Sequence, residues 1–351
     1  MSGSSLPPVS QTQPKKGSYT MHPFARFIQI LGKGRNGMRA LTLEEAYEAM
    51  QMIACYDVEP EQIGAFLMLM RVKEESAEEV AGFTRALRES LPTQGKEMAP
   101  AIDWAAYAGK KRQLPWFLLA ALILVRQGYP VCMHGMNRSD DRVYVPEALD
   151  ALGMEAANSL QEAMEGLNET GFCYLPISKL SPLTAQLIAT RELLGLRPPL
   201  QTVARMLNPF NAPLSLIGVF HPNYAAIHTA AARIEGRRIV VCKGEGGEFE
   251  RIPDRPLQLS GCDQGELWDE SWQPLMQAGT ALREQRLNLH HYCEVWEGDC
   301  EDAYGEAAVV GTLAMVIRAL ELERAEDAAH RLASRWWRDR HRSDSAREAI
   351  L

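Results

Sequence analysis

The chain has 351 residues, of which 46% are hydrophobic and 23% charged, as in an ordinary globular protein large enough for two domains. No apolar run reaches the length of a membrane span, which excludes an integral membrane protein. The seven cysteines are scattered without a C-x-x-C pair, so reduced thiols and a cytoplasmic location are expected. The formal net charge of −8 argues mildly against nucleic-acid binding, but local basic clusters count more than the sum.

The first part of the chain is predicted to be helical. Residues 1–20 are rich in Ser, Pro, Gln and Lys and predict a disordered leader. Thr42-x-x-Glu45 and Ser76-x-x-Glu79 are capping boxes that each begin a helix. Pro60 suits the first turn of an apolar helix between them. These signals predict a small all-helical domain over residues 21–97.

From residue 98 the pattern changes to that of an α/β protein. Short apolar runs typical of strands alternate with helical stretches, which predicts a central, mostly parallel sheet. The predicted α/β domain covers residues 98–179 and 207–351, and its clearest strand-like runs lie at 129–133, 171–177, 214–220 and 238–242.

A basic loop before an apolar helix is the main candidate for phosphate binding. Gly109 is followed by Lys110, Lys111 and Arg112, and a helix N-terminus collects anions. With one glycine the loop cannot bring several backbone N–H groups to a pyrophosphate. Its side-chain cations suit the spaced phosphates of a polymer instead. The alternative is a solvated basic turn.

Two further basic clusters are weaker candidates. Lys33 and Arg35 lie in a short loop for which a simple turn is the alternative. Arg335 and Arg338 flank two tryptophans, a combination that suits phosphate contact and base stacking. A packed C-terminal helix whose cations favour its own dipole is the alternative there. The acidic, His- and Cys-containing stretch 290–302 has no zinc or calcium spacing, so no metal site is predicted.

Four ordered segments resemble the anthranilate phosphoribosyltransferase family, glycosyltransferase family 3. They are LTLEEAYEAMQMI with the helices after it, the 132–138 segment CMHGMNR, the 191–209 segment RELLGLR…NP, and YGEAAVVGT at 304–312. The resemblance implies a nucleoside phosphorylase/phosphoribosyltransferase class II-like fold, with a helical dimerisation domain that the chain rejoins at about residues 180–206. The implied ligand-site positions are Gly109, His134, Gly135, Asn137, Arg197 and Glu250.

The residues depart from this family where its chemistry is expected. The family holds phosphoribosyl pyrophosphate with a Gly-Thr-Gly-Gly-Asp loop, but residues 105–109 read Ala-Ala-Tyr-Ala-Gly. The motif lysine is Met133, and the Asp-Glu pair that helps to hold magnesium maps onto Phe249-Glu250. Magnesium prefers two or more hard oxygen ligands. The sequence therefore predicts no anthranilate phosphoribosyltransferase activity.

An offshoot of the family that lacks these parts and binds nucleic acid as a dimer is similar in the 109–113 loop GKKRQ and in His221-Pro222-x-Tyr224. The chain is therefore expected to be a cytoplasmic homodimer that binds single-stranded DNA or RNA with little sequence specificity and without a cofactor. One alternative is a glycosyltransferase or phosphoribosyltransferase of the same family that acts on another substrate and uses Mg²⁺. Another is a folded relic that serves only as an interaction partner.

Overall fold

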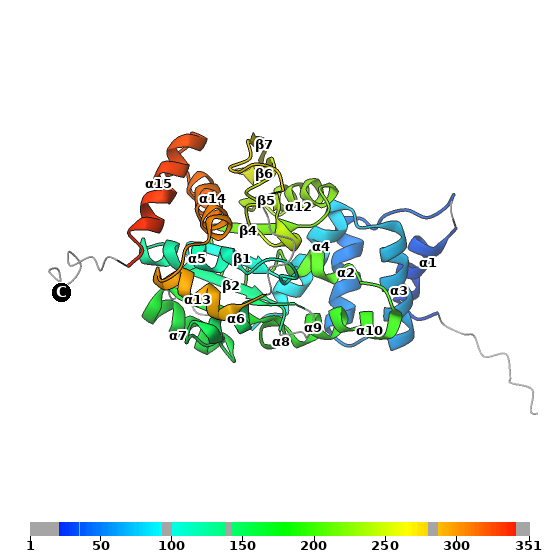
Figure 1. Cartoon of the computed structure of the whole chain (residues 1–351). Helices are drawn as coiled ribbons and strands as arrows, with labels where there is room; N and C mark the ends of the chain where they lie inside the picture. The colour runs from blue at the N-terminus through cyan, green and yellow to red at the C-terminus, as the bar shows by residue number, and fades with distance from the viewer. Residues whose placement is uncertain (1–20, 35, 93–99, 138–141, 280–286, 342–351) are drawn as a thin grey trace, which may run out of the picture.

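The computed structural model describes residues 21–34, 36–92, 100–137, 142–279 and 287–341. The predicted leader 1–20 and Arg35 lie outside the described residues. Figure 1 shows a helical part on the right and an α/β part on the left. Among the described helices, none has the length and apolar character needed to cross a membrane.

The helical part is built from two separate stretches of the chain. Both expected capping boxes form, at Thr42/Glu45 and Ser76/Glu79, and Pro60 lies in the first turn of its helix. The first stretch forms α1 (Ala25–Gly32), α2 (Leu43–Ala54), α3 (Pro60–Lys73) and α4 (Ala77–Glu89). The second forms α8 (Ile177–Leu180), α9 (Pro182–Ala189), α10 (Arg191–Leu194) and α11 (Leu200–Ala204). Apolar side chains from both stretches share one core.

A seven-stranded sheet in the order β3-β2-β1-β4-β5-β6-β7 forms the centre of the α/β part. The first five strands in this order are parallel, whereas β6 and β7 form an antiparallel hairpin at one edge. The predicted fold class is therefore confirmed. The strands are β1 (Ile102–Ala106), β2 (Val131–Gly135), β3 (Phe172–Pro176), β4 (Leu214–Val219), β5 (Ile239–Lys243), β6 (Leu257–Asp263) and β7 (Glu266–Trp272).

Helices cover both faces of this sheet. On one face α5 packs against α14, and α14 packs against α15. On the other face α12 packs against β5, β6 and the helical part's α4. The helices are α5 (Trp116–Arg126), α6 (Val145–Ala151), α7 (Leu160–Thr170), α12 (Asn223–Ile234), α13 (Leu289–Glu297), α14 (Ala303–Ala319) and α15 (Glu326–Arg338), with a short 3₁₀ turn η1 (Glu245–Gly247) after β5.

Strand β1 connects the two hydrophobic cores because its side chains alternate between the faces of the sheet. Ile102 and Trp104 belong to the core under α5 and α14. Ala105 and Tyr107 belong to the core of the helical part. The loop that follows β1 is therefore held between the two parts of the molecule.

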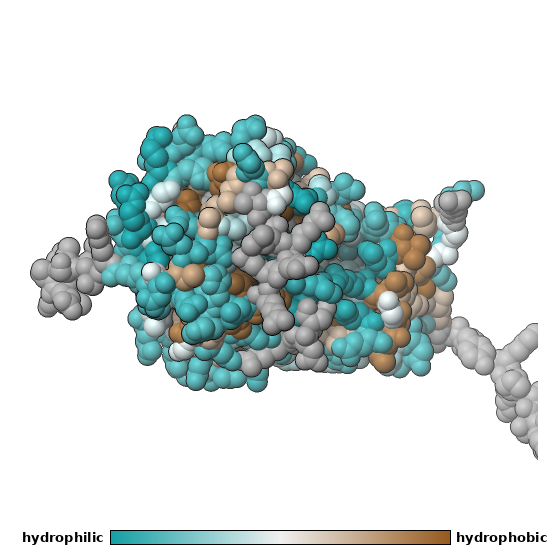
Figure 2. Space-filling view, viewed as in Figure 1, coloured by the Kyte–Doolittle hydropathy of each residue, from teal (hydrophilic) through white to brown (hydrophobic). Residues whose placement is uncertain are grey.

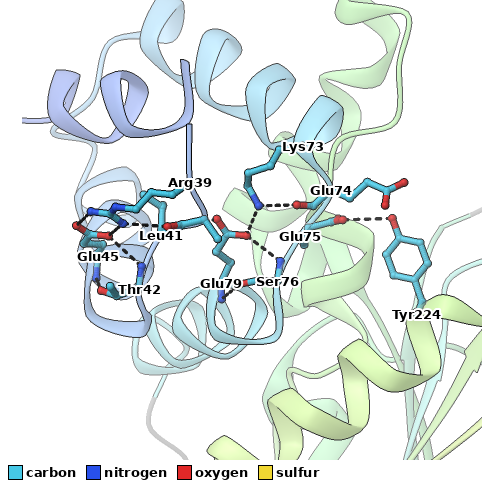
Figure 3. A network of polar contacts seen from close by, with 11 residues as sticks. Arg39, Leu41, Thr42, Glu45, Lys73, Glu74, Glu75, Ser76, Glu79 and Tyr224 are labelled. Atoms are coloured by element: carbon cyan, nitrogen blue, oxygen red, sulfur yellow. Dashed lines mark hydrogen bonds and ion pairs between the residues drawn. The ribbon is translucent and has the colours of Figure 1, made fainter. Parts of the chain in front are cut away.

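A polar network in the helical part also reaches α12, the helix that packs on one face of the sheet (Figure 3). The Glu75 carboxylate, 6% exposed, accepts hydrogen bonds from the Tyr224 hydroxyl of α12 and the Thr202 hydroxyl of α11. Close by, Glu79 accepts from the backbone N–H groups of Leu41 and Ser76 and pairs with Lys73. Burial raises the pKa of Glu75, so its carboxylate depends on these donors. The Glu75–Tyr224 hydrogen bond thus joins the helical part to α12 in addition to the apolar contacts.

Candidate functional site at the carboxyl edge of the sheet

The carboxyl ends of β1, β2, β4 and β5 meet at one edge of the parallel sheet. Open α/β sheets bind ligands outside this edge. The strand ends at this edge and the segments that follow them contain most of the residues predicted from the sequence, among them the 109–112 loop, His134 and Glu250.

The loop after β1 binds an anionic group, and this group is a carboxylate side chain of the protein itself. One carboxylate oxygen of Glu248, Oε1, accepts hydrogen bonds from the backbone N–H groups of Ala108 and Gly109, each at 2.6 Å. Gly109 has a φ of 65° and the Tyr144 ring packs directly on it, so no side chain fits there. The loop thus binds a carboxylate that comes from the segment after β5.

Lys110 is buried, with 0% exposure, and does not lie on the surface as the sequence predicted. Its ammonium lies 2.5 Å from Glu245 Oε2 and 2.5 Å from Glu250 Oε1. Burial lowers the pKa of Lys110, but Glu250 and Glu245 outweigh this, and the net shift is upward. The sequence predicted that Lys110 contacts the phosphates of a polymer. This prediction is corrected, because the ammonium is held by two carboxylates of the protein itself. Lys111 and Arg112 are exposed.

The side chain of Glu250 contacts the start of α5. Its second oxygen, Oε2, accepts from the backbone N–H of Phe117 at 2.9 Å. Burial raises the pKa of Glu250 to about 7, against the opposing effect of Lys110. Both oxygens of the residue that matches the family's metal-binding pair are thus taken by Lys110 and the helix. The described carboxylates do not fit a magnesium ion, and no group of three potential ligands occurs among the described residues.

His134 lies beneath this edge in a fully buried cluster. Its Nδ1 is 2.8 Å from the Tyr107 hydroxyl, and its Nε2 is 3.2 Å from Asp103 Oδ1. Burial raises the pKa of Tyr107 well above its usual value. The sequence analysis did not single out Asp103 or Tyr107. The alternation along β1 could have identified them, since it places both side chains on the face shared by Ala105, the strand partner of His134.

An exposed aromatic ring and a lysine complete the outer surface of the edge. Phe220 follows β4 and is 62% exposed, with its ring edge-to-face on His221 at 4.9 Å. Lys243 ends β5 and is exposed. A Cβ on Gly247 would lie 3.3 Å from the Phe220 Cβ and 3.5 Å from the Ala108 Cβ, so the glycine turn joins the β1 loop to Phe220. We call this surface the edge platform: Lys111, Arg112, Phe220 and Lys243 around the turn 244–247.

The other predicted residues lie away from the edge platform or at its margin. Asn137 is exposed and exchanges hydrogen bonds with Ser178, and Arg197 is exposed between α10 and α11. Lys33 follows α1, at the opposite end of the molecule from α15 (Figure 1), which carries the exposed Arg335 and Arg338.

The basic residues predicted from the sequence therefore do not form one continuous surface. On α15, Trp337 is buried and Trp336 packs beside the Tyr129 ring at 6.2 Å, so both tryptophans contribute to packing. Arg335 and Arg338 line a hollow together with three acidic residues, Glu306, Glu326 and Asp327.

Comparison with known proteins agrees with the predicted resemblance. Residues 28–91 match the glycosyl transferase family helical bundle domain. The uncharacterized protein YbiB of Escherichia coli is 26% identical over 247 residues, which cover 69% of this chain and 77% of YbiB. Anthranilate phosphoribosyltransferase of Thermus thermophilus is 28% identical over 206 residues, which cover 58% of this chain and 63% of that enzyme, slightly less than two thirds of its length.

Solved structures agree on the fold. The crystal structure of the Thermus thermophilus anthranilate phosphoribosyltransferase superposes with a TM-score of 0.76 at 22% identity, covering 90% of this chain and 94% of the other. The Saccharomyces cerevisiae enzyme in complex with PRPP and Mg gives 0.71 at 13% identity, covering 90% and 93%. Residues 28–91 thus match the glycosyl transferase family helical bundle domain, and the chain is similar to anthranilate phosphoribosyltransferases, whose fold it shares.

Proposed function

We propose that this protein binds single-stranded DNA or RNA through the edge platform, with little sequence specificity. The observation that carries the proposal is an exposed aromatic ring, Phe220, at the same sheet edge as the exposed cations Lys111, Arg112 and Lys243. Exposed rings stack on any base, and cations neutralise the backbone phosphates without reading sequence.

The rival proposal, a transferase acting on another phosphorylated substrate, has less support from the geometry. The backbone N–H groups of the β1 loop are bound to Glu248, and the ring nitrogens of His134 face Tyr107 and Asp103 in the interior. Neither group is presented to a small substrate at the edge.

The test is the affinity for a labelled oligothymidine, measured by fluorescence anisotropy over a range of salt concentrations. The double variant Lys111→Ala/Arg112→Ala should bind more weakly, and the slope of log affinity against log salt should shrink by about 1.4, or about 0.7 for each lost phosphate contact. The control is Arg233→Ala/Arg324→Ala, which removes two exposed cations from elsewhere on the chain. Equal behaviour of the two double variants would contradict the role of the platform, and no binding by wild type at low salt would contradict the function itself.

Phe220→Ala tests the stacking component separately. Loss of a stacking ring should weaken single-strand binding by about 1–3 kcal/mol and leave the salt slope unchanged, because no phosphate contact is lost. Tyr56→Ala, which removes an exposed ring from the helical part, should bind as wild type does. The same assay on Arg335→Ala/Arg338→Ala tests the second predicted basic cluster.

A further inference from the structure

Three glutamates of one short segment under the edge platform have no part in the proposed function. Glu245, Glu248 and Glu250 come from one short segment after β5 and face the β1 loop and the start of α5. Glu248 is 1% exposed and Glu250 is 0% exposed. Burial of carboxylates is unfavourable unless strong donors hold them, so these contacts require an explanation.

The donors that hold them are those expected to bind a phosphate. Backbone N–H groups at a strand–loop–helix junction bind phosphate oxygens in many proteins. Here Glu248 Oε1 is bound to the N–H groups of Ala108 and Gly109, and Glu250 Oε2 to the N–H of Phe117 at the start of α5. Two side chains of the protein thus lie where an anionic ligand would lie.

Close backbone packing fixes Glu248 in this position. A Cβ on Gly218 would lie 2.1 Å from the Glu248 carbonyl carbon, and a Cβ on Gly244 would lie 1.7 Å from the Glu248 carbonyl oxygen. The main chain of Glu248 is therefore pressed against β4 and against its own turn, with glycines at both contact points. The carboxylate is held in place by a rigid segment rather than by a flexible surface loop.

The three carboxylates of this segment oppose a second anion. Burial raises the pKa of Glu248, while Arg205 and the two loop N–H groups act in the opposite direction and favour its charged form. Lys110 is already shared between Glu245 and Glu250. A phosphate that entered would meet three carboxylates and would have to displace one of them.

We propose that Glu248 is an internal ligand that permanently occupies the anion site of the β1 loop, so that the wild-type protein binds no phosphate or diphosphate there. Without this carboxylate the two N–H groups form a site for small oxyanions such as formate or inorganic phosphate. This inference does not depend on nucleic-acid binding, which is measured in a separate assay on a different surface.

Chemical rescue of Glu248→Ala in the full chain tests the proposal. The variant should be less stable than wild type, and formate or inorganic phosphate, titrated at constant ionic strength with NaCl, should raise its Tm saturably by about 3 °C or more. The matched control is Val241→Ala, which shortens a buried side chain on β5 without releasing an N–H group. A rescue of Glu248→Ala no larger than that of Val241→Ala would overturn the proposal.

A measurement on the wild-type protein covers the case in which Glu248→Ala does not fold. The backbone amide resonances of Ala108 and Gly109 should not move when inorganic phosphate or pyrophosphate is titrated into the wild type. A saturable shift of these two resonances would show that an external anion enters the loop, and the proposal would be wrong.

Discussion

Lys110 and Lys111 are adjacent in the sequence and have opposite environments. The ammonium of Lys110 is enclosed by Glu245 and Glu250, whereas Lys111 is exposed at the surface. Removal of one partner of a buried ion pair leaves an uncompensated charge in the interior, which costs about 3–5 kcal/mol. An exposed lysine contributes little to stability.

Lys110→Ala should therefore lower the free energy of unfolding by about 3–5 kcal/mol, and Lys111→Ala should change it by less than about 1 kcal/mol, because an exposed lysine contributes little even where it is paired. Urea denaturation at pH 7.5, followed by circular dichroism, measures both. If the two variants lose similar stability, the buried cluster does not have the energetic role that its geometry indicates.

A second residue-scale prediction concerns His228 on α12. Burial, with a smaller effect of Arg205, lowers the pKa of His228 to about 3, so its imidazole is neutral in the folded state. The unfolded histidine titrates near 6.5, so the unfolded state binds the proton first as the pH falls. The contribution of neutral His228 to the free energy of unfolding is therefore complete above about pH 6.5 and is lost as the pH falls toward 3.

When the pH is lowered from 7.5 to 5.0, protonation of His228 in the unfolded state should reduce the free energy of unfolding of the wild-type protein by about 2 kcal/mol. This is about 1.36 kcal/mol for each pH unit below 6.5. His228→Gln should lose correspondingly less over the same interval, as measured by urea denaturation at the two pH values. His290→Gln, at an exposed histidine of α13, serves as the control and should keep the wild-type loss. If His228→Gln lost as much free energy of unfolding as the wild type between the two pH values, the lowered pKa assigned to His228 would be wrong.

At the scale of elements, the helical part exposes large apolar side chains to water. Val72 on α3 is 78% exposed, and Leu193 on α10 is 88% exposed. On the face shown in Figure 2, hydrophobic residues gather at this end of the molecule, whereas on the α/β part they are scattered among hydrophilic ones. Contiguous exposed apolar surface marks an interaction site. Association of two copies through this end, as expected from the sequence, remains a proposal.

Light scattering coupled to gel filtration should therefore give twice the mass of the chain at micromolar concentration. Val72→Asp/Leu193→Asp should shift the particle to the monomer mass, because two charges would be buried in the interface. Leu267→Asp, at an exposed leucine of β7, should leave the mass unchanged. A monomeric wild type would contradict the prediction directly.

The elements that the sequence predicted well are those with a local cause. The capping boxes at Thr42 and Ser76 formed because their hydrogen bonds join residues three apart. The parallel strands β2, β3, β4 and β5 were recognised from their continuous apolar runs, which are typical of strands buried on both faces, whereas β1 was not among the predicted runs. The β6–β7 hairpin was missed, because its outer strand is rich in acidic residues and alternates in burial.

The internal bonds of the site could not be predicted in this way. Glu248 and Gly109 are 139 positions apart, and Lys110 and Glu250 are 140 positions apart. Such pairs are brought together only by the order of the strands in the sheet. From the composition of the loop alone, Lys110 was predicted to be an exposed cation. The edge platform was likewise found only in part, since the exposure of Phe220 depends on packing around the end of β4.

At the scale of the whole molecule, the protein combines a fold shared with phosphoribosyltransferases and a ligand edge whose binding groups are bonded to one another. The β1 loop N–H groups bind Glu248, the start of α5 binds Glu250, and Lys110 joins Glu250 to Glu245. Phosphoribosyl pyrophosphate would need these N–H groups, and magnesium would need these carboxylates. The same internal bonds thus oppose the binding of phosphoribosyl pyrophosphate and of magnesium.

The wild-type protein should therefore form no product from anthranilate and phosphoribosyl pyrophosphate in the presence of Mg²⁺. Loss of anthranilate fluorescence measures the reaction, with the Thermus thermophilus enzyme as the positive control and a reaction without protein as the blank. Glu248→Ala should also be inactive, because an emptied anion site restores neither the metal carboxylates nor an accessible histidine. Magnesium-dependent product above the blank from wild type would show that the internal bonds open in solution, and the transferase alternative would then replace the nucleic-acid-binding proposal.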